Sequence, residues 1–251
     1  MGFPEINIIF KSVASNTVKR GDKGIVYAIL RDLDAVKGVY EMTSAAEIPA
    51  GVTAANKAQL EMILKGGVNA PKKVVADVQG PTPEGIAAPL TRAEAIRFDY
   101  LVVIGGTEAE YTAAASAVKS MRSNLGKRVK AILPHTPSDS EGIINFDTDN
   151  IECGAVTYTA AEFCGRTAGL LAGTPLSGSL TFTVLPEVTD VPRMSKAEAG
   201  TAVDAGKLIL FHDGEKVKIA RGVNSLITLG ADKSEQFQKI KIVDIIDTVH
   251  T

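Results

Sequence analysis

The chain has 251 residues, of which 45% are hydrophobic, enough for one large domain or two small ones. Its formal net charge of −2 argues against nucleic acid as a partner, because binding to phosphates requires a basic surface. No apolar run is long enough to cross a bilayer, so we expect no membrane insertion.

The first predicted element is an apolar, extended segment, EINIIFK, at residues 5–11. A polar stretch, residues 12–20, separates it from a second predicted strand at residues 25–30. The segment is either an edge strand of the chain's own sheet or an arm that pairs with a sheet edge of another subunit. Its apolar contact residues would be Ile6, Ile8, Ile9 and Phe10.

Capping motifs predict where several helices begin. A helix is expected at residues 53–65, closed by Gly66-Gly67, and is followed by a strand at residues 73–78. In four further places a Ser or Thr precedes a Glu by three residues, the pattern of a capping box. These pairs are Thr91/Glu94, Thr107/Glu110, Thr159/Glu162 and Ser195/Glu198.

The middle of the chain alternates between strands and helices. An apolar strand at residues 100–104, a helix from Thr107 to Gly126 and a strand at residues 129–133 predict a parallel, right-handed βαβ unit. The next helix, residues 160–172, has glycines at 165, 169 and 173, which we interpret as a face that packs closely on the sheet. A strand is expected at residues 179–184, and the Ser195 helix should end at Gly206.

Residues 207–223 predict a β-hairpin. With Asp213-Gly214 as a two-residue turn, Leu210 would face Val217 and Leu208 would face Ile219 on a buried side. Ile209 and Phe211 would then lie on a partly covered side, and the charged tip would include His212 and Glu215.

The last predicted element is a helix that begins near Ser234. Its apolar stripe runs to the end of the sequence with no terminating residue, which suggests a domain cut short. Three lysines in this terminal region, Lys233, Lys239 and Lys241, could contact an acidic partner or simply form a solvated face.

The candidates for catalysis or ligand binding are weak. Gly105-Gly106-Thr107 lies between a strand and a helix, where backbone amides could hold a phosphate, but the glycine spacing and lysine of a P-loop are missing. Ser138 lies in a polar loop after a strand, with no nucleophile-elbow motif beside it. Cys153 and Cys164 have no metal-binding spacing, so we interpret them as free thiols and expect no cofactor or metal.

Several longer segments together resemble the tail sheath proteins of contractile-tailed phages, in the form found in Gram-positive prophages and phage-tail-like bacteriocins. The resemblance covers nearly the whole chain in order, and its segments include EINIIFK, EGIINF, AGLLAGTPL, LPEV and LILFHDGEKVKIARGVNSL. It implies a mixed α/β fold with a subtilisin-like sheath domain in the middle, a smaller β-containing N-terminal region and an extended N-terminal arm. Such sheath proteins are not enzymes, so the resemblance implies no enzyme, and none of the protease triad is recognisable here.

The resemblance also implies a function and partners. Sheath subunits form stacked hexameric rings around a tail tube, are anchored to a baseplate, and contract to drive the tube through a cell envelope. We therefore expect a virion tail or tail-like particle that is assembled in the host bacterial cytoplasm. The residues at 6, 8, 9 and 10 would be subunit contacts of the arm, and the hairpin tip and the three terminal lysines would contact the tube or other subunits.

The expected division of the chain has four parts. Residues 1–20 are the arm, 21–90 the N-terminal β-containing region, 91–230 the α/β sheath core, and 231–251 the start of an incomplete C-terminal domain. The alternative function is a small-molecule-binding α/β enzyme with its site near Gly105–Thr107 and Ser138.

Overall fold

Continuous apolar runs in the sequence become the strands of one mostly parallel sheet. The structure is a computed structural model that describes residues 24–81, 85–230 and 233–249. Seven strands are arranged in the order β2-β3-β1-β4-β5-β6-β9. They are β1 (Ile25–Arg31), β2 (Gly38–Met42), β3 (Lys73–Gln79), β4 (Tyr100–Val103), β5 (Lys130–Pro134), β6 (Ile143–Phe146) and β9 (Lys207–Leu208).

The central strand β1 shows why the sheet is buried on both faces. It pairs in parallel with β3 and with β4, while β2 is an antiparallel edge strand. Alternate residues of β1 belong to two different cores: Val26, Ala28 and Leu30 to one, and Ile25, Tyr27 and Ile29 to the other. The sheet is therefore the middle layer of a three-layer α/β fold.

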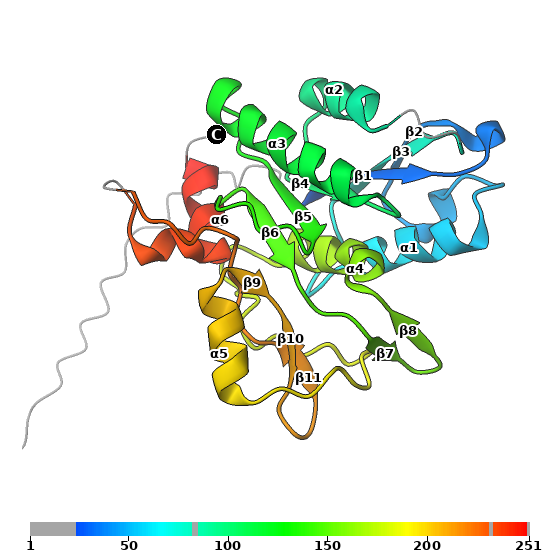
Figure 1. The fold of residues 1–251 in the computed structure, drawn as a ribbon. Helices are drawn as coiled ribbons and strands as arrows, with labels where there is room; N and C mark the ends of the chain where they lie inside the picture. Colours follow the sequence, from blue (N-terminus) through cyan, green and yellow to red (C-terminus); the bar gives the residue numbers. More distant parts are fainter. Residues whose placement is uncertain (1–23, 82–84, 231–232, 250–251) are drawn as a thin grey trace, which may run out of the picture.

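Helices cover the two faces of the sheet (Figure 1). The α-helices among the described residues are α1 (Ala54–Leu64), α2 (Ala87–Ala95), α3 (Glu108–Asn124), α4 (Ala160–Ala172), α5 (Lys196–Asp204) and α6 (Ile240–Val249). Residues of α1 and α4 contribute to the core of one face, and residues of α2 and α3 to the core of the other. Short 3-10 turns occur at Asp34–Val36, Ala45–Glu47 and Glu235–Gln238.

Two small hairpins and α5 lie beside one end of the sheet (Figure 1). One hairpin pairs β7 (Ile151–Cys153) with β8 (Val156–Tyr158), and the other pairs β10 (Leu210–His212) with β11 (Val217–Ile219). Buried Leu210, Val217 and Ile219 belong to the same core as α1 and α4. The second hairpin is therefore part of the main fold.

The predicted βαβ unit is confirmed, and so are three of the four capping boxes. Strands β4 and β5 are parallel, with α3 between them. At Thr107, Thr159 and Ser195 the side chain accepts the N3 amide, and the N3 Glu accepts the cap amide. The fourth box is wrong: Thr91 lies within α2 and its hydroxyl donates to the Ala87 carbonyl.

The predicted hairpin exists, but its predicted register is wrong. Leu210 pairs with Ile219 and His212 with Val217, so the loop has four residues, 213–216. The Asp213 carboxylate accepts the Glu215 and Lys216 amides at 3.0 and 2.9 Å, which stabilises this longer loop. Ile209 is also fully buried, contrary to the expectation that it lies on a partly covered side.

Two further expectations are corrected. Residues 179–184 form no regular strand: Val184 makes one isolated bridge to Lys218, and Phe182 has a φ of +61°, which interrupts extended pairing. The glycine face of α4 packs on helix α1 and the turn after it, because a Cβ at Gly169 would lie 2.0 Å from the Ile63 carbonyl oxygen.

The expected boundary between residues 90 and 91 falls within α2, and strands from both sides of it belong to the seven-stranded sheet. No helix in the described ranges is both long and apolar enough to span a membrane.

Candidate functional site

Helix α6 is fixed to the amino end of β5 by buried ion pairs. Lys130 Nζ lies 2.9 Å from Asp244 Oδ1 and also pairs with Asp247. Arg122 Nη1 of α3 lies 3.1 Å from Asp247 Oδ2. Lys130 and Asp247 are each 1% exposed. Because an unpaired charge in the interior is costly, these pairs hold α6 in one position.

The charges of this cluster determine the ionisation of Asp247. Burial alone raises the pKa of this carboxyl, but the attraction and hydrogen bonds of Lys130 and Arg122 outweigh burial and lower it. Arg122 also lies 3.6 Å from Glu141, whose carboxylate in turn pairs with Lys233. A row of alternating charges thus links α3, the start of β6 and the segment before α6.

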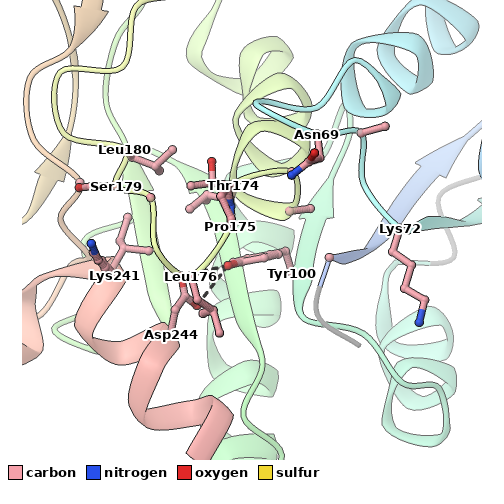
Figure 2. Close-up of a pocket in the computed structure, with 18 residues that line it drawn as sticks. Asn69, Lys72, Tyr100, Thr174, Pro175, Leu176, Ser179, Leu180, Lys241 and Asp244 are labelled. Atoms are coloured by element: carbon pink, nitrogen blue, oxygen red, sulfur yellow. Dashed lines mark hydrogen bonds between the residues drawn. The ribbon is translucent and has the colours of Figure 1, made fainter. Parts of the chain in front are cut away.

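A cavity of about 230 Å³ lies next to this cluster (Figure 2). It is bounded by the end of α4, the loop after it, the amino ends of strands and the first turn of α6. The Tyr100 hydroxyl points at Asp244 and lies 3.1 Å from both of its carboxylate oxygens. Burial raises the pKa of Tyr100, so its hydroxyl stays protonated and donates a hydrogen bond.

The chain enters the described fold at the rim of this cavity. Gly24 lines it, and the Asp99 carboxylate accepts the amides of Gly24 and Ile25 at 2.7 and 2.9 Å. The arm residues Ile6, Ile8, Ile9 and Phe10 lie outside the described residues, so their subunit contacts stay a prediction.

In the structure each of the three predicted lysines has an intramolecular partner. Lys233 pairs with Glu141 at 2.9 Å. Lys239 donates to the Gln236 side chain at 2.8 Å, and Lys241 donates to the Ser177 carbonyl at 3.0 Å. Each ammonium group is therefore already engaged within the chain, and contact of these lysines with a partner stays a prediction.

The hairpin tip is ordered by its own side chains. His212 Nδ1 accepts from Arg193 at 2.8 Å and from the Gly214 amide at 2.9 Å. Glu215 is exposed at the end of the loop. The tip is a charged loop held by side-chain hydrogen bonds, and its role as an inter-subunit contact stays a prediction.

Gly105–Thr107 and Ser138, the two groups of residues expected at an enzyme site, have structural roles. The amide and hydroxyl of Thr107 contact the Glu110 carboxylate, which also pairs with Arg31, so the α3 N-terminus already has an anion. A Cβ at Gly106 would lie 2.8 Å from Val103, which explains the glycine. The Ser138 carbonyl accepts a hydrogen bond from Lys119.

One histidine is close to two carboxylates at the carboxyl ends of β5 and β6. His135 Nδ1 lies 2.5 Å from Asp147, and its Nε2 lies 2.8 Å from Asp149. Lys207 pairs with Asp147 at 2.6 Å, and Asp149 accepts the Ala160 amide at the start of α4. These ion pairs and hydrogen bonds connect the loops after β5 and β6 to the start of α4. The residues lie in separate segments of the sequence, so the sequence did not predict that they meet.

The described cysteines are free thiols, with Cys164 buried and Cys153 half-buried. Burial raises the pKa of Cys164 well above its ordinary value. No group of three or more His, Cys, Asp or Glu suited to a metal ion occurs among the residues that the structure describes.

Comparisons with known proteins indicate that the chain is related to tail sheath proteins. Residues 79–225 match the model of the phage tail sheath protein central domain. The chain is 37% identical, over 99% of its own length and 70% of the relative's, to the tail sheath protein of Clostridium phage phiCD119. The chain therefore belongs to the phage tail sheath protein family.

Solved structures have the same fold at lower identity. The sheath tail protein from Listeria innocua superposes with a TM-score of 0.82 at 19% identity, covering 92% of this chain and 76% of that one. The helical sheath of the anti-feeding prophage in its contracted state gives a TM-score of 0.67 at 12% identity, covering 99% and 74%. The predicted mixed α/β fold is confirmed.

Proposed function

We propose that this chain is a structural subunit of a contractile tail sheath, with no catalytic role. Its subunits assemble as stacked hexameric rings around a tail tube, are anchored at a baseplate, and contract to drive the tube through a cell envelope. The observation that carries this proposal is the 37% identity to a tail sheath protein along 99% of the chain. The shared fold with a helical sheath in its contracted state supports the contractile assembly.

The particle and its compartment follow from this role. The subunit is assembled in the host bacterial cytoplasm and ends in the tail of a virion or of a phage-tail-like particle. The test is to express the chain with the tube and baseplate proteins of the same particle and to examine the product by negative-stain microscopy. Tubes with six-fold end views are expected. A chain that stays monomeric with these partners present would refute the proposal.

Residues 1–20 act as an arm that adds a strand to the sheet of a neighbouring subunit. The alternation of Ile6, Ile8 and Phe10 supports this, since a paired strand inserts alternate side chains. Replacing these three residues with Ser should leave a folded protein that no longer forms tubes. Replacing Glu5 and Lys11 with Ser is the matched control and should leave assembly intact. Sheaths of normal length from the triple variant would rule out the arm.

A further inference from the structure

A cavity of about 440 Å³ lies between the turn that precedes β4 and the turn that precedes β5. Arg97 lies on the first turn, and Lys127 and Arg128 lie on the second. The end of α6 closes one side of the cavity with Asp247 and Thr248. Three cationic side chains from two separate turns thus line one hollow.

The three cations differ in what they already bind. Lys127 Nζ caps the end of α2, donating to the carbonyls of Ala93 at 3.4 Å, Ile96 at 3.2 Å and Glu94. Its burial lowers the pKa of its ammonium group, with the nearby Glu94 opposing the shift. In the described part of the chain, neither Arg97 nor Arg128 makes a side-chain hydrogen bond or ion pair. Arg97 is exposed and Arg128 is half-buried.

The carboxylates that line the cavity have other partners. Asp99 accepts the amides of Gly24 and Ile25, and Asp247 pairs with Arg122 and Lys130. Neither carboxylate is paired with Arg97 or Arg128. The cavity is therefore lined by two arginines that have no side-chain partner among the described residues, in a concave site where an opposite charge is attracted more strongly than on a flat surface.

We propose that this cavity, defined by Arg97 and Arg128, binds carboxylates of an acidic segment of a partner protein. A guanidinium group binds a carboxylate through two parallel hydrogen bonds, and two such groups can hold neighbouring acidic side chains. The net charge of −2 and the small aromatic content oppose a nucleic acid ligand. That the ligand belongs to a protein rests on the proposed structural role, in which a sheath subunit contacts other proteins.

The test uses the full chain and a fluorescein-labelled hexaglutamate peptide, followed by fluorescence anisotropy in low salt. Saturable binding is expected, and hexaglutamine should not bind. The double variant Arg97→Gln/Arg128→Gln should weaken binding at least about tenfold, because both charge-assisted contacts are lost. Arg221→Gln is the matched control: Arg221 is an exposed arginine outside this cavity, and its variant should bind as the wild type does.

Three outcomes would overturn the proposal: no binding by the wild type, equal binding by the double variant, or equal weakening by Arg221→Gln. Stronger binding of inorganic phosphate or of a single-stranded oligonucleotide than of the peptide would overturn the assignment to a protein carboxylate. Urea unfolding of both variants confirms that any loss is not due to unfolding. Peptide binding is measured on the isolated chain and tests only the cavity, whereas tube formation tests the proposed sheath function. A failure of one proposal can therefore be distinguished from a failure of the other.

Discussion

A Cβ atom at Gly169 would lie 2.0 Å from the carbonyl oxygen of Ile63, and that oxygen is part of a helix backbone that cannot rotate away. We predict that Gly169→Ala destabilises the protein by at least about 2 kcal/mol, because α4 and α1 must move apart. Urea unfolding measures the change. Gly200→Ala in α5 is the control: no atom lies within 4 Å of its Cβ, so it should stabilise the helix by about 0.5–1 kcal/mol.

Asp247 gives a prediction about buried charge. Replacing it with Asn leaves Lys130 and Arg122 with less compensation in the interior, so Asp247→Asn should destabilise the protein by about 3–5 kcal/mol near neutral pH. Lys57→Gln, which removes an exposed pair at 4.0 Å, should change stability by less than about 0.5 kcal/mol. Equal effects of the two substitutions would contradict the structural role of the cluster.

The same residue gives a pH dependence. The folded-state pKa of Asp247 is lowered, so its stabilising contribution is complete above the ordinary pKa of an aspartate, about 3.9, and is lost as the pH falls through the lowered value. The difference in unfolding free energy between wild type and Asp247→Asn should be constant from about pH 5 to 7 and should shrink below about pH 4. Unfolding series at several pH values measure it; a difference that grows in acid would contradict this assignment.

The buried cluster was missed at the sequence level, although a signal was present. Lys130 begins a strand whose other residues are apolar, and Asp247 shares a helix stripe with Ile240 and Val243. Each is an isolated charge in an apolar pattern, and such charges need an opposite partner when buried. Their pairing could not be predicted, because it depends on how α6 docks, more than a hundred residues away in the chain.

At the scale of elements, the capping motif predicted a helix start correctly in the three cases in which its Ser or Thr lies at the N-cap position, and wrongly at Thr91, which lies inside α2. Thr159→Ala should destabilise the protein by about 1 kcal/mol, because it removes the side chain that accepts the Glu162 amide. Thr91 has the same spacing from a Glu but lies inside α2, so Thr91→Ala should change stability by less than about 0.5 kcal/mol. Thermal or urea unfolding compares the pair, and similar losses at both sites would contradict the observed helix start.

The strands were predicted well where apolar runs were continuous, as in β1, β3, β4 and β5, since buried parallel strands have apolar residues on both faces. The hairpin was predicted in kind but not in register. Asp213-Gly214 suggested a two-residue turn, but the Asp213 carboxylate accepts two following amides and favours a longer loop. Hydrogen bonds between a turn side chain and the following amides thus set the register of the hairpin, and the hydrophobic pattern does not reveal them.

For the whole molecule, the sequence predicted the α/β fold and the family, but it did not show that strands from residues 25–79 and 100–208 share one sheet. Long-range pairing of β1 with β4 joins segments that look separate along the chain. The residues alone left the N-terminal segment as either an edge strand or an arm, and the three lysines as either a partner contact or a solvated face, because contacts with other subunits are not encoded in the pattern of one chain.

The alternative function can also be tested on the whole molecule. The glycine turn at residues 105–107 already has the Glu110 carboxylate at its helix N-terminus, where it accepts the Thr107 amide. We therefore predict that nucleotides, nicotinamide cofactors and divalent metals give no saturable increase in melting temperature, since only ligands of the native state raise it. A saturable shift that disappears on Thr107→Glu substitution would instead favour a small-molecule site at this turn.

The contact between α4 and α1 has a mechanical consequence. At Gly169 and Gly173 helix α4 meets the backbone of Ile63 at the end of α1 and of the turn after it, so no rotamer change can absorb a displacement at these two points. A shift of α4 along α1 would bring a residue with a side chain against the Ile63 carbonyl. The pair is therefore expected to move only as one stiff block, and if the subunit changes shape in the proposed contraction, that change is expected to take place elsewhere in the fold.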